Sequence, residues 1–113
     1  VTDAAYLRLL AAKLPGWLDR FDPDLVLYQA GVDALAVDAL GRLALTPAGL
    51  RARNDHVYRA VWSERRVPIV VTMGGGYGRP IEASVPSLAD VFDQAARWLA
   101  AHPATQQFAD ASR

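Results

Sequence analysis

The sequence predicts an α/β fold with three layers, in which helices cover both faces of a parallel sheet. Two short apolar runs, at residues 25–29 and 67–73, each lead into glycine and show little alternation with polar residues. Runs of this kind are typical of strands that are buried on both faces, as in parallel sheets. A helix-like segment separates the runs, and a crossover of this length joins parallel strands. The expected order is therefore helix, strand, helix, strand, helix.

The first helix is indicated by apolar residues at every third or fourth position between residues 6 and 18. Thr2 or Asp3 can act as its N-cap, because both side chains accept hydrogen bonds from free backbone amides. Pro15 lies inside the pattern, where it removes an amide donor and clashes with the preceding turn. We therefore expect a kink or a restart of the helix at this proline.

The two later helices have recognisable start signals. Thr46 followed by Pro47 matches an N-cap and a first helical position. Ser87 has an acidic residue three positions later, which resembles a capping box. Residues 31–45 are expected to form a long loop. The predicted inner face of the third helix consists of Leu88, Val91, Phe92, Ala95 and Leu99.

The chain has 113 residues, with 12 basic and 12 acidic side chains and no cysteine. We expect residues 1–113 to be a single partial domain with a frayed tail over residues 103–113. Zero net charge gives no electrostatic surface for nucleic acid, and no apolar run approaches the ~18 residues of a membrane span. The lack of cysteine excludes disulfides and thiolate metal sites and is compatible with a cytoplasmic location, which we expect. Because the first residue is Val1, not Met, we expect the chain to be processed or cut from a longer one.

The residues that could carry chemistry follow the two predicted strands. In open α/β sheets, sites form at the carboxyl ends of the strands. One loop at this edge holds two carboxylates, and the other holds a glycine cluster followed by a phenol. These residues are Asp33 and Asp38 in the first loop, and Gly74, Gly75, Gly76 and Tyr77 in the second.

Each of these features also has a plain structural interpretation. A dinucleotide-binding glycine pattern would need glycine where Arg79 stands, and no Lys-Ser or Lys-Thr follows, so nucleotide binding is disfavoured. The glycines can instead form a tight turn with positive φ, or clear space so that Tyr77 points into a pocket. The loop aspartates can be solvated or cap turns, or one of them can bind a metal such as zinc.

The two histidines, His56 and His102, are the only imidazoles of the chain. The helical projection places His56 opposite the apolar face of the second helix, so it should be exposed to solvent. His102 falls at a helix end, where a cation is mildly favoured by the helix dipole. We expect neither to be a metal ligand.

Two stretches together carry a family resemblance: "FDPDLVLYQAGVDALAVDALGRLALTPAGLRARNDHVYRA" at residues 21–60 and "VPIVVTMGGGY" at residues 67–77. They resemble the C-terminal part of the zinc-dependent deacetylase family, which includes histone deacetylases and acetylpolyamine amidohydrolases. The likeness is closest to bacterial, class-IV-like members and covers roughly residues 3–100. It implies that the chain is about a third of a domain with the arginase–deacetylase fold.

The resemblance also implies an activity, the zinc-dependent hydrolysis of an acetylated amine such as acetyl-lysine in a protein or a small acetylpolyamine. Asp38 falls on the position of a zinc ligand, and Tyr77 falls on the tyrosine that polarises the acetyl carbonyl. The three glycines before Tyr77 would shape the pocket, and Gln29 and Asp33 would support it as polar neighbours. A phenol that stabilises the growing oxyanion is a physical reason for clearing side chains ahead of it.

Several features of the family are missing from the chain. Val37 and Ala39 depart from the residues that commonly flank the ligand position. The chain also has no Asp-x-His motif and no His-His pair, whereas catalytic zinc normally needs three protein ligands. We therefore expect the isolated chain to be inactive, and the alternative is a non-catalytic interaction or assembly module. Its open sheet edge should favour self-association or binding of a missing N-terminal part.

Overall fold

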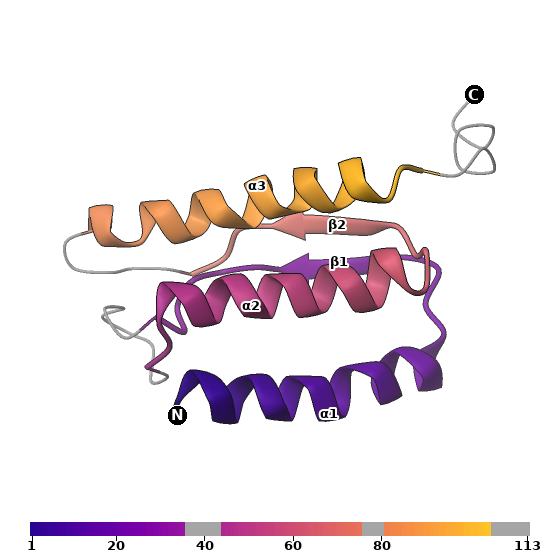
Figure 1. The fold of residues 1–113 in the computed structure, drawn as a ribbon, viewed down its shortest axis with the longest axis horizontal. Helices are drawn as coiled ribbons and strands as arrows, with labels where there is room; N and C mark the ends of the chain where they lie inside the picture. The colour runs from indigo at the N-terminus through magenta and orange to yellow at the C-terminus, as the bar shows by residue number, and fades with distance from the viewer. Residues whose placement is uncertain (36–43, 76–80, 105–113) are drawn as a thin grey trace.

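The computed structural model describes residues 1–35, 44–75 and 81–104. The elements occur in the order helix, strand, helix, strand, helix, as the sequence predicts (Figure 1). They are α1 (Asp3–Phe21), β1 (Val26–Gln29), α2 (Pro47–Tyr58), the π-helical turn η1 (Arg59–Ser63), β2 (Ile69–Thr72), the 3-10 turn η2 (Ile81–Ala83) and α3 (Val85–Ala101). No helix in these described ranges combines the length and hydropathy that crossing a membrane requires.

The two strands pair in parallel, which confirms the prediction from the long crossover. Val26 lies opposite Ile69, and Gln29 lies opposite Thr72. The pairing continues past the strand ends, because the amide of Ala30 donates to the carbonyl oxygen of Thr72 at 2.8 Å. Both strands therefore end at one edge, and Figure 1 shows the three helices running in the opposite direction.

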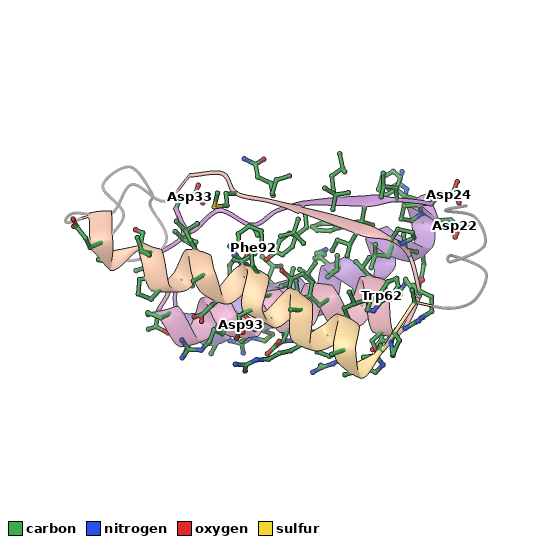
Figure 2. All side chains as sticks on the ribbon, turned by 90° about the horizontal axis from the view of Figure 1, so that it is seen from above. Asp22, Asp24, Asp33, Trp62, Phe92 and Asp93 are labelled. Atoms are coloured by element: carbon green, nitrogen blue, oxygen red, sulfur yellow. The ribbon has the colours of Figure 1, made fainter. Side chains whose placement is uncertain are left out.

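The strands are covered on one face only within the described residues, although burial on both faces was expected. Exposure alternates along each strand, so that Leu27 is 72% exposed and Val70 is 44% exposed. Their neighbours Tyr28 and Val71 are partly buried on the face toward the helices. Figure 2 shows α2 and α3 on the same side of the two strands. The apolar residues at the outward positions of both strands therefore form an apolar sheet face that none of the described residues covers.

Four predictions about the helices need correction or refinement. α1 runs without a break through Pro15, so the expected restart is wrong. Its N-cap is Thr2, whose hydroxyl accepts from the amide of Ala5 at 3.2 Å. α3 begins at Val85 instead of Ser87, because a proline fits well in the first helical turn. Of its predicted inner face Val91 is buried, whereas two members are largely exposed: Phe92 and Leu99.

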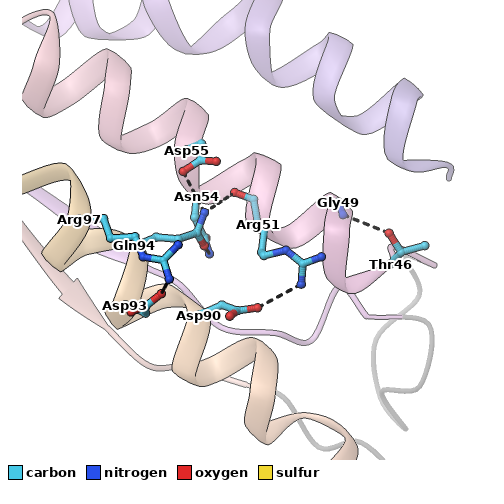
Figure 3. Close-up of polar contacts among 9 residues, drawn as sticks. All are labelled: Thr46, Gly49, Arg51, Asn54, Asp55, Asp90, Asp93, Gln94 and Arg97. Carbon is cyan, nitrogen blue, oxygen red and sulfur yellow. Dashed lines mark hydrogen bonds and ion pairs between the residues drawn. The ribbon is translucent and has the colours of Figure 1, made fainter. Parts of the chain in front are cut away.

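The start of α2 follows the sequence closely. Thr46 is the N-cap, and its hydroxyl accepts from the amide of Gly49 at 3.0 Å (Figure 3). The Asp3 carboxylate accepts hydrogen bonds from both the amide and the hydroxyl of Thr46. A methyl group on Gly49 would overlap this carboxylate, so the glycine permits the close approach of α1 to α2.

Candidate functional site

The carboxyl ends of β1 and β2 touch through their backbones. A methyl group placed on Gly31, just beyond β1, would overlap the carbonyl group of Gly74, just beyond β2. Only glycine leaves room for this contact at position 31. The two loops that follow the strands are therefore in direct contact at their first residues, at the edge where α/β folds place their sites.

The glycines of the second loop also make room for side chains of the first. A methyl group on Gly74 would overlap the side-chain amide of Gln29. Gly75 has a φ of 75°, and a methyl group there would lie 3.0 Å from the side-chain carbons of Asp33. The positive-φ interpretation therefore applies to Gly75, whereas close approach explains Gly74. Figure 2 shows Asp33 at the end of the molecule opposite Asp22 and Asp24.

The first loop is anchored at its base by two buried leucines. Leu35 and Leu45 form an isolated parallel bridge, and they are 2% and 1% exposed. The amide of Leu45 donates to the carbonyl oxygen of Ala34 at 3.0 Å. Asp38, within the loop, lies outside the described residues. Gly76 and Tyr77 of the second loop also lie outside them, so the structure describes only the bases of both loops.

A buried arginine contacts the base of the first loop. Arg53 of α2 is 6% exposed, and its Nη1 donates to the carbonyl oxygen of Gly31 at 2.8 Å. Its Nε and Nη2 both donate to Oδ1 of Asn54, at 3.2 Å and 3.1 Å. Neither residue was predicted from the sequence. Their spacing from Leu50 and Val57 places them on the apolar face of α2, and that signal could have revealed them.

The same asparagine continues the network toward the other elements. The Tyr28 hydroxyl donates to Oδ1 of Asn54 at 2.6 Å, and Nδ2 of Asn54 donates to Oε1 of Gln94 at 2.9 Å. Nε2 of Gln94 then donates to the Asp55 carboxylate at 2.9 Å (Figure 3). Nε1 of Trp98 donates to the same carboxylate oxygen at 2.9 Å. A polar network thus joins β1, α2 and α3 beneath the strand ends.

Two tyrosines of the core stay protonated at neutral pH. Burial raises the pKa of Tyr28 well above its usual value of 10.0, although the nearby Arg53 charge opposes the shift. Burial also raises the pKa of Tyr58 to about 12. Each hydroxyl is therefore available as a donor, and the Tyr58 hydroxyl donates to the carbonyl oxygen of Val91 at 2.8 Å.

The histidines lie away from the strand ends. His56 is half-buried in a crevice beside Leu14 and Arg59, so the expectation that it is exposed is not met. His102 follows α3 as its C-cap, in agreement with the prediction, and its ring stacks on Trp98 with centroids 5.5 Å apart. Within residues 1–35, 44–75 and 81–104, no group of three or more His, Cys, Asp or Glu side chains could hold a metal ion.

Comparison with known proteins identifies the family. Residues 1–92 match the family model of the histone deacetylase domain. The chain belongs to the histone deacetylase family. Its α/β class and parallel sheet agree with this deacetylase domain, which confirms the predicted fold class and the predicted family.

Three relatives illustrate how much of the chain is matched. Histone deacetylase 2 of Arabidopsis thaliana is 35% identical over 96 residues, which are 85% of this chain and 24% of that protein. An uncharacterized protein of Picosynechococcus sp. is 39% identical over 79 residues, 70% of this chain and 26% of that protein. A histone deacetylase-like amidohydrolase of Pseudomonas aeruginosa is 35% identical over 82 residues, 73% of this chain and 21% of that protein. The chain therefore spans about a quarter of these relatives' length.

Proposed function

We propose that this chain forms one side of a deacetylase site that hydrolyses acetylated amines, either acetyl-lysine in a protein or a small acetylpolyamine. The proposal is carried by one observation, the backbone contact between Gly31 and Gly74. This contact brings together the bases of the two loops that contain Asp38 and Tyr77. Membership of the histone deacetylase family supports the reaction type.

Tyr77 is proposed to stabilise the transition state. Its phenol would donate a hydrogen bond to the acetyl oxygen as negative charge grows there during attack on the amide. The preceding glycines, Gly74, Gly75 and Gly76, would leave the phenol as the side chain of this loop that reaches the substrate. Gln29 and Asp33 lie against Gly74 and Gly75 and would keep the loop in place.

The chain alone does not fit a catalytic zinc site. Asp38 would be one ligand, whereas a catalytic zinc normally has three protein ligands and an open position. The sequence contains neither an Asp-x-His motif nor a His-His pair, and the described residues offer no cluster of three metal-binding side chains. In a complete site, zinc would polarise the carbonyl and activate water. We therefore propose that another polypeptide segment completes the site and that the isolated chain is inactive.

A chimera tests this function. The matched segment of the Pseudomonas aeruginosa amidohydrolase is replaced by this chain, and zinc content is measured together with hydrolysis of an acetyl-lysine peptide and of acetylputrescine. We expect bound zinc and measurable turnover. Tyr77→Phe should keep the zinc and lower kcat on the order of 10²–10³-fold, the usual effect of removing an oxyanion donor. Unchanged turnover in Tyr77→Phe would contradict the role of this residue.

The open face of the sheet favours a second candidate, a non-catalytic assembly module. Leu27 and Val70 are exposed there, by 72% and 44%. Since the matched relatives are about four times longer than the match, we propose that this face meets the remainder of a deacetylase-like domain. A chimera that folds with normal stability but has neither zinc nor turnover would favour the assembly role.

A further inference from the structure

The buried position of Arg53 calls for an explanation beyond packing. A guanidinium stays charged in proteins, and burying a charge is costly unless it is well paired. Arg53 is 6% exposed, and its hydrogen bonds go to neutral oxygen atoms, the carbonyl of Gly31 and the side-chain amide of Asn54. Among the described residues, none of the ion pairs involves Arg53. The guanidinium therefore serves as a rigid donor fork for these two acceptors.

The fork is fixed on its inner side. Asn54 is fully buried, and the Tyr28 hydroxyl and Gln94 bind its side chain from β1 and α3. The Arg53 guanidinium also lies 5.6 Å from the centroid of the Tyr28 ring. The position of the Asn54 side chain is thus fixed by contacts among β1, α2 and α3. The hydrogen bonds from Nε and Nη2 to Oδ1 of Asn54 fix the position of the guanidinium. Nη1 is therefore also fixed, and it restrains the carbonyl group of Gly31.

Through Nη1, the Arg53 guanidinium is connected to the bases of both loops. Gly31 accepts the hydrogen bond from Arg53, and its Cα lies against the carbonyl of Gly74. A shift of the Gly31 peptide would therefore press on the second loop as well. Ala30 precedes Gly31, and its amide donates to the carbonyl oxygen of Thr72 at 2.8 Å. Hydrogen exchange of this amide therefore measures how firmly the two strand ends are held together.

We propose that Arg53 is the positioning residue of this edge, because its guanidinium fixes the Gly31 carbonyl and thereby the packing of residues 30–35 against residues 73–75. The catalytic consequence rests on the proposed function, in which Asp38 and Tyr77 lie farther along the same two loops. Lysine can reproduce only part of the role, because one ammonium group lacks the planar fork that reaches both acceptors.

The positioning itself is tested on the 113-residue chain, without metal or substrate. Arg53→Met is compared with Arg51→Met, which removes an exposed guanidinium from the same helix, and with Val57→Ala, which weakens the core of that helix. We expect only Arg53→Met to shift the carbonyl carbon resonance of Gly31 and the amide resonances of residues 74–75. Amide exchange at Ala30 should become roughly tenfold faster or more, as expected for loss of one charge-assisted hydrogen bond.

Other results would overturn the positioning role. If Gly31, Gly74 and Ala30 respond to Arg53→Met as they do to Val57→Ala, Arg53 contributes only to general stability. If Arg53→Met does not fold, Arg53→Lys decides: it should shift the Gly31 resonance and give an intermediate exchange rate at Ala30. Unchanged signals in Arg53→Lys would overturn the proposal.

The chimera separates this inference from the proposed function. With Arg53→Met we expect kcat to fall on the order of 10²-fold with KM little changed, since misplaced groups act on the chemical step. Arg53→Lys should recover part of kcat. An inactive parent chimera would reject the proposed function and leave the resonance test to decide on Arg53. An active chimera that is indifferent to Arg53→Met would reject the catalytic consequence.

Discussion

At the scale of single residues, the strictest requirement for glycine among the described positions lies at the junction of the two loops. Gly31→Ala would drive a methyl group into the carbonyl of Gly74, and backbone atoms cannot yield as a flexible side chain does. We expect a loss of about 1–3 kcal/mol in the free energy of unfolding, the usual range for overpacking. Urea denaturation of the 113-residue chain measures this loss.

Gly16 provides the matched control for that substitution. It lies inside α1, and nothing lies within 4 Å of a methyl group added there. Gly16→Ala should therefore stabilise the chain by about 0.5–1 kcal/mol, because alanine loses less backbone entropy in a helix. Equal effects of Gly16→Ala and Gly31→Ala would contradict the close contact between the loops.

The residues of the candidate site differ in how far sequence could predict them. Topology alone indicates that Gln29, Asp33, Gly74 and Gly75 share one edge, because parallel strands end together. The structure places these residues in contact. The partner of Arg53 could not be predicted, because it is a backbone carbonyl 22 positions away, and every residue type carries one.

At the scale of elements, local sequence signals predict where a helix starts better than they predict which distant residues it contacts. Thr46 and Pro47 determine the start of α2 through capping, which depends on neighbouring residues only. Asp3 was considered as a cap for α1, yet its carboxylate binds Thr46, 43 positions away. The open face of the strands also could not be predicted. Apolar residues on both faces of a strand indicate that both faces become buried, but they do not indicate whether this chain or another segment covers them.

The junction between α1 and α2 should make stability depend on pH. The side-chain hydrogen bond from Thr46, with its backbone hydrogen bond second, lowers the pKa of Asp3 below the usual 3.8. Because the folded-state pKa is depressed, ionised Asp3 stabilises the fold above the usual value, and this contribution disappears as pH falls through the folded-state pKa. Asp3→Asn should therefore be less stable than the parent at neutral pH, and the difference should shrink on acidification.

Urea midpoints measured at about pH 7 and about pH 2 check this junction, because linkage relates the change in midpoint to the proton bound by Asp3. All other carboxylates are common to the parent and to Asp3→Asn, so their effects cancel in the comparison. A difference between the two proteins that stays constant across this range would show that the Asp3 carboxylate does not stabilise the fold through its charge.

At the scale of the whole molecule, the uncovered sheet is the main departure from a self-contained domain. A two-stranded sheet is marginal by itself, and both of its edges and one face are open within the described residues. If the remainder of a deacetylase-like domain normally covers this face, the isolated chain should self-associate as concentration rises. Sedimentation velocity of the 113-residue chain measures this association.

Charge on the open face should suppress the association. The double substitution Leu27→Glu and Val70→Glu places two carboxylates on the uncovered face of the sheet. The side chains at these positions are 72% and 44% exposed. Because neither side chain is in the core, the change in stability should stay near 0.5 kcal/mol, typical of surface positions. Leu9→Glu on α1, at a side chain 60% exposed, is the control and should leave association unchanged. If the parent stays monomeric, or if Leu9→Glu acts as strongly as the sheet substitutions, the open face is not the contact surface that we propose.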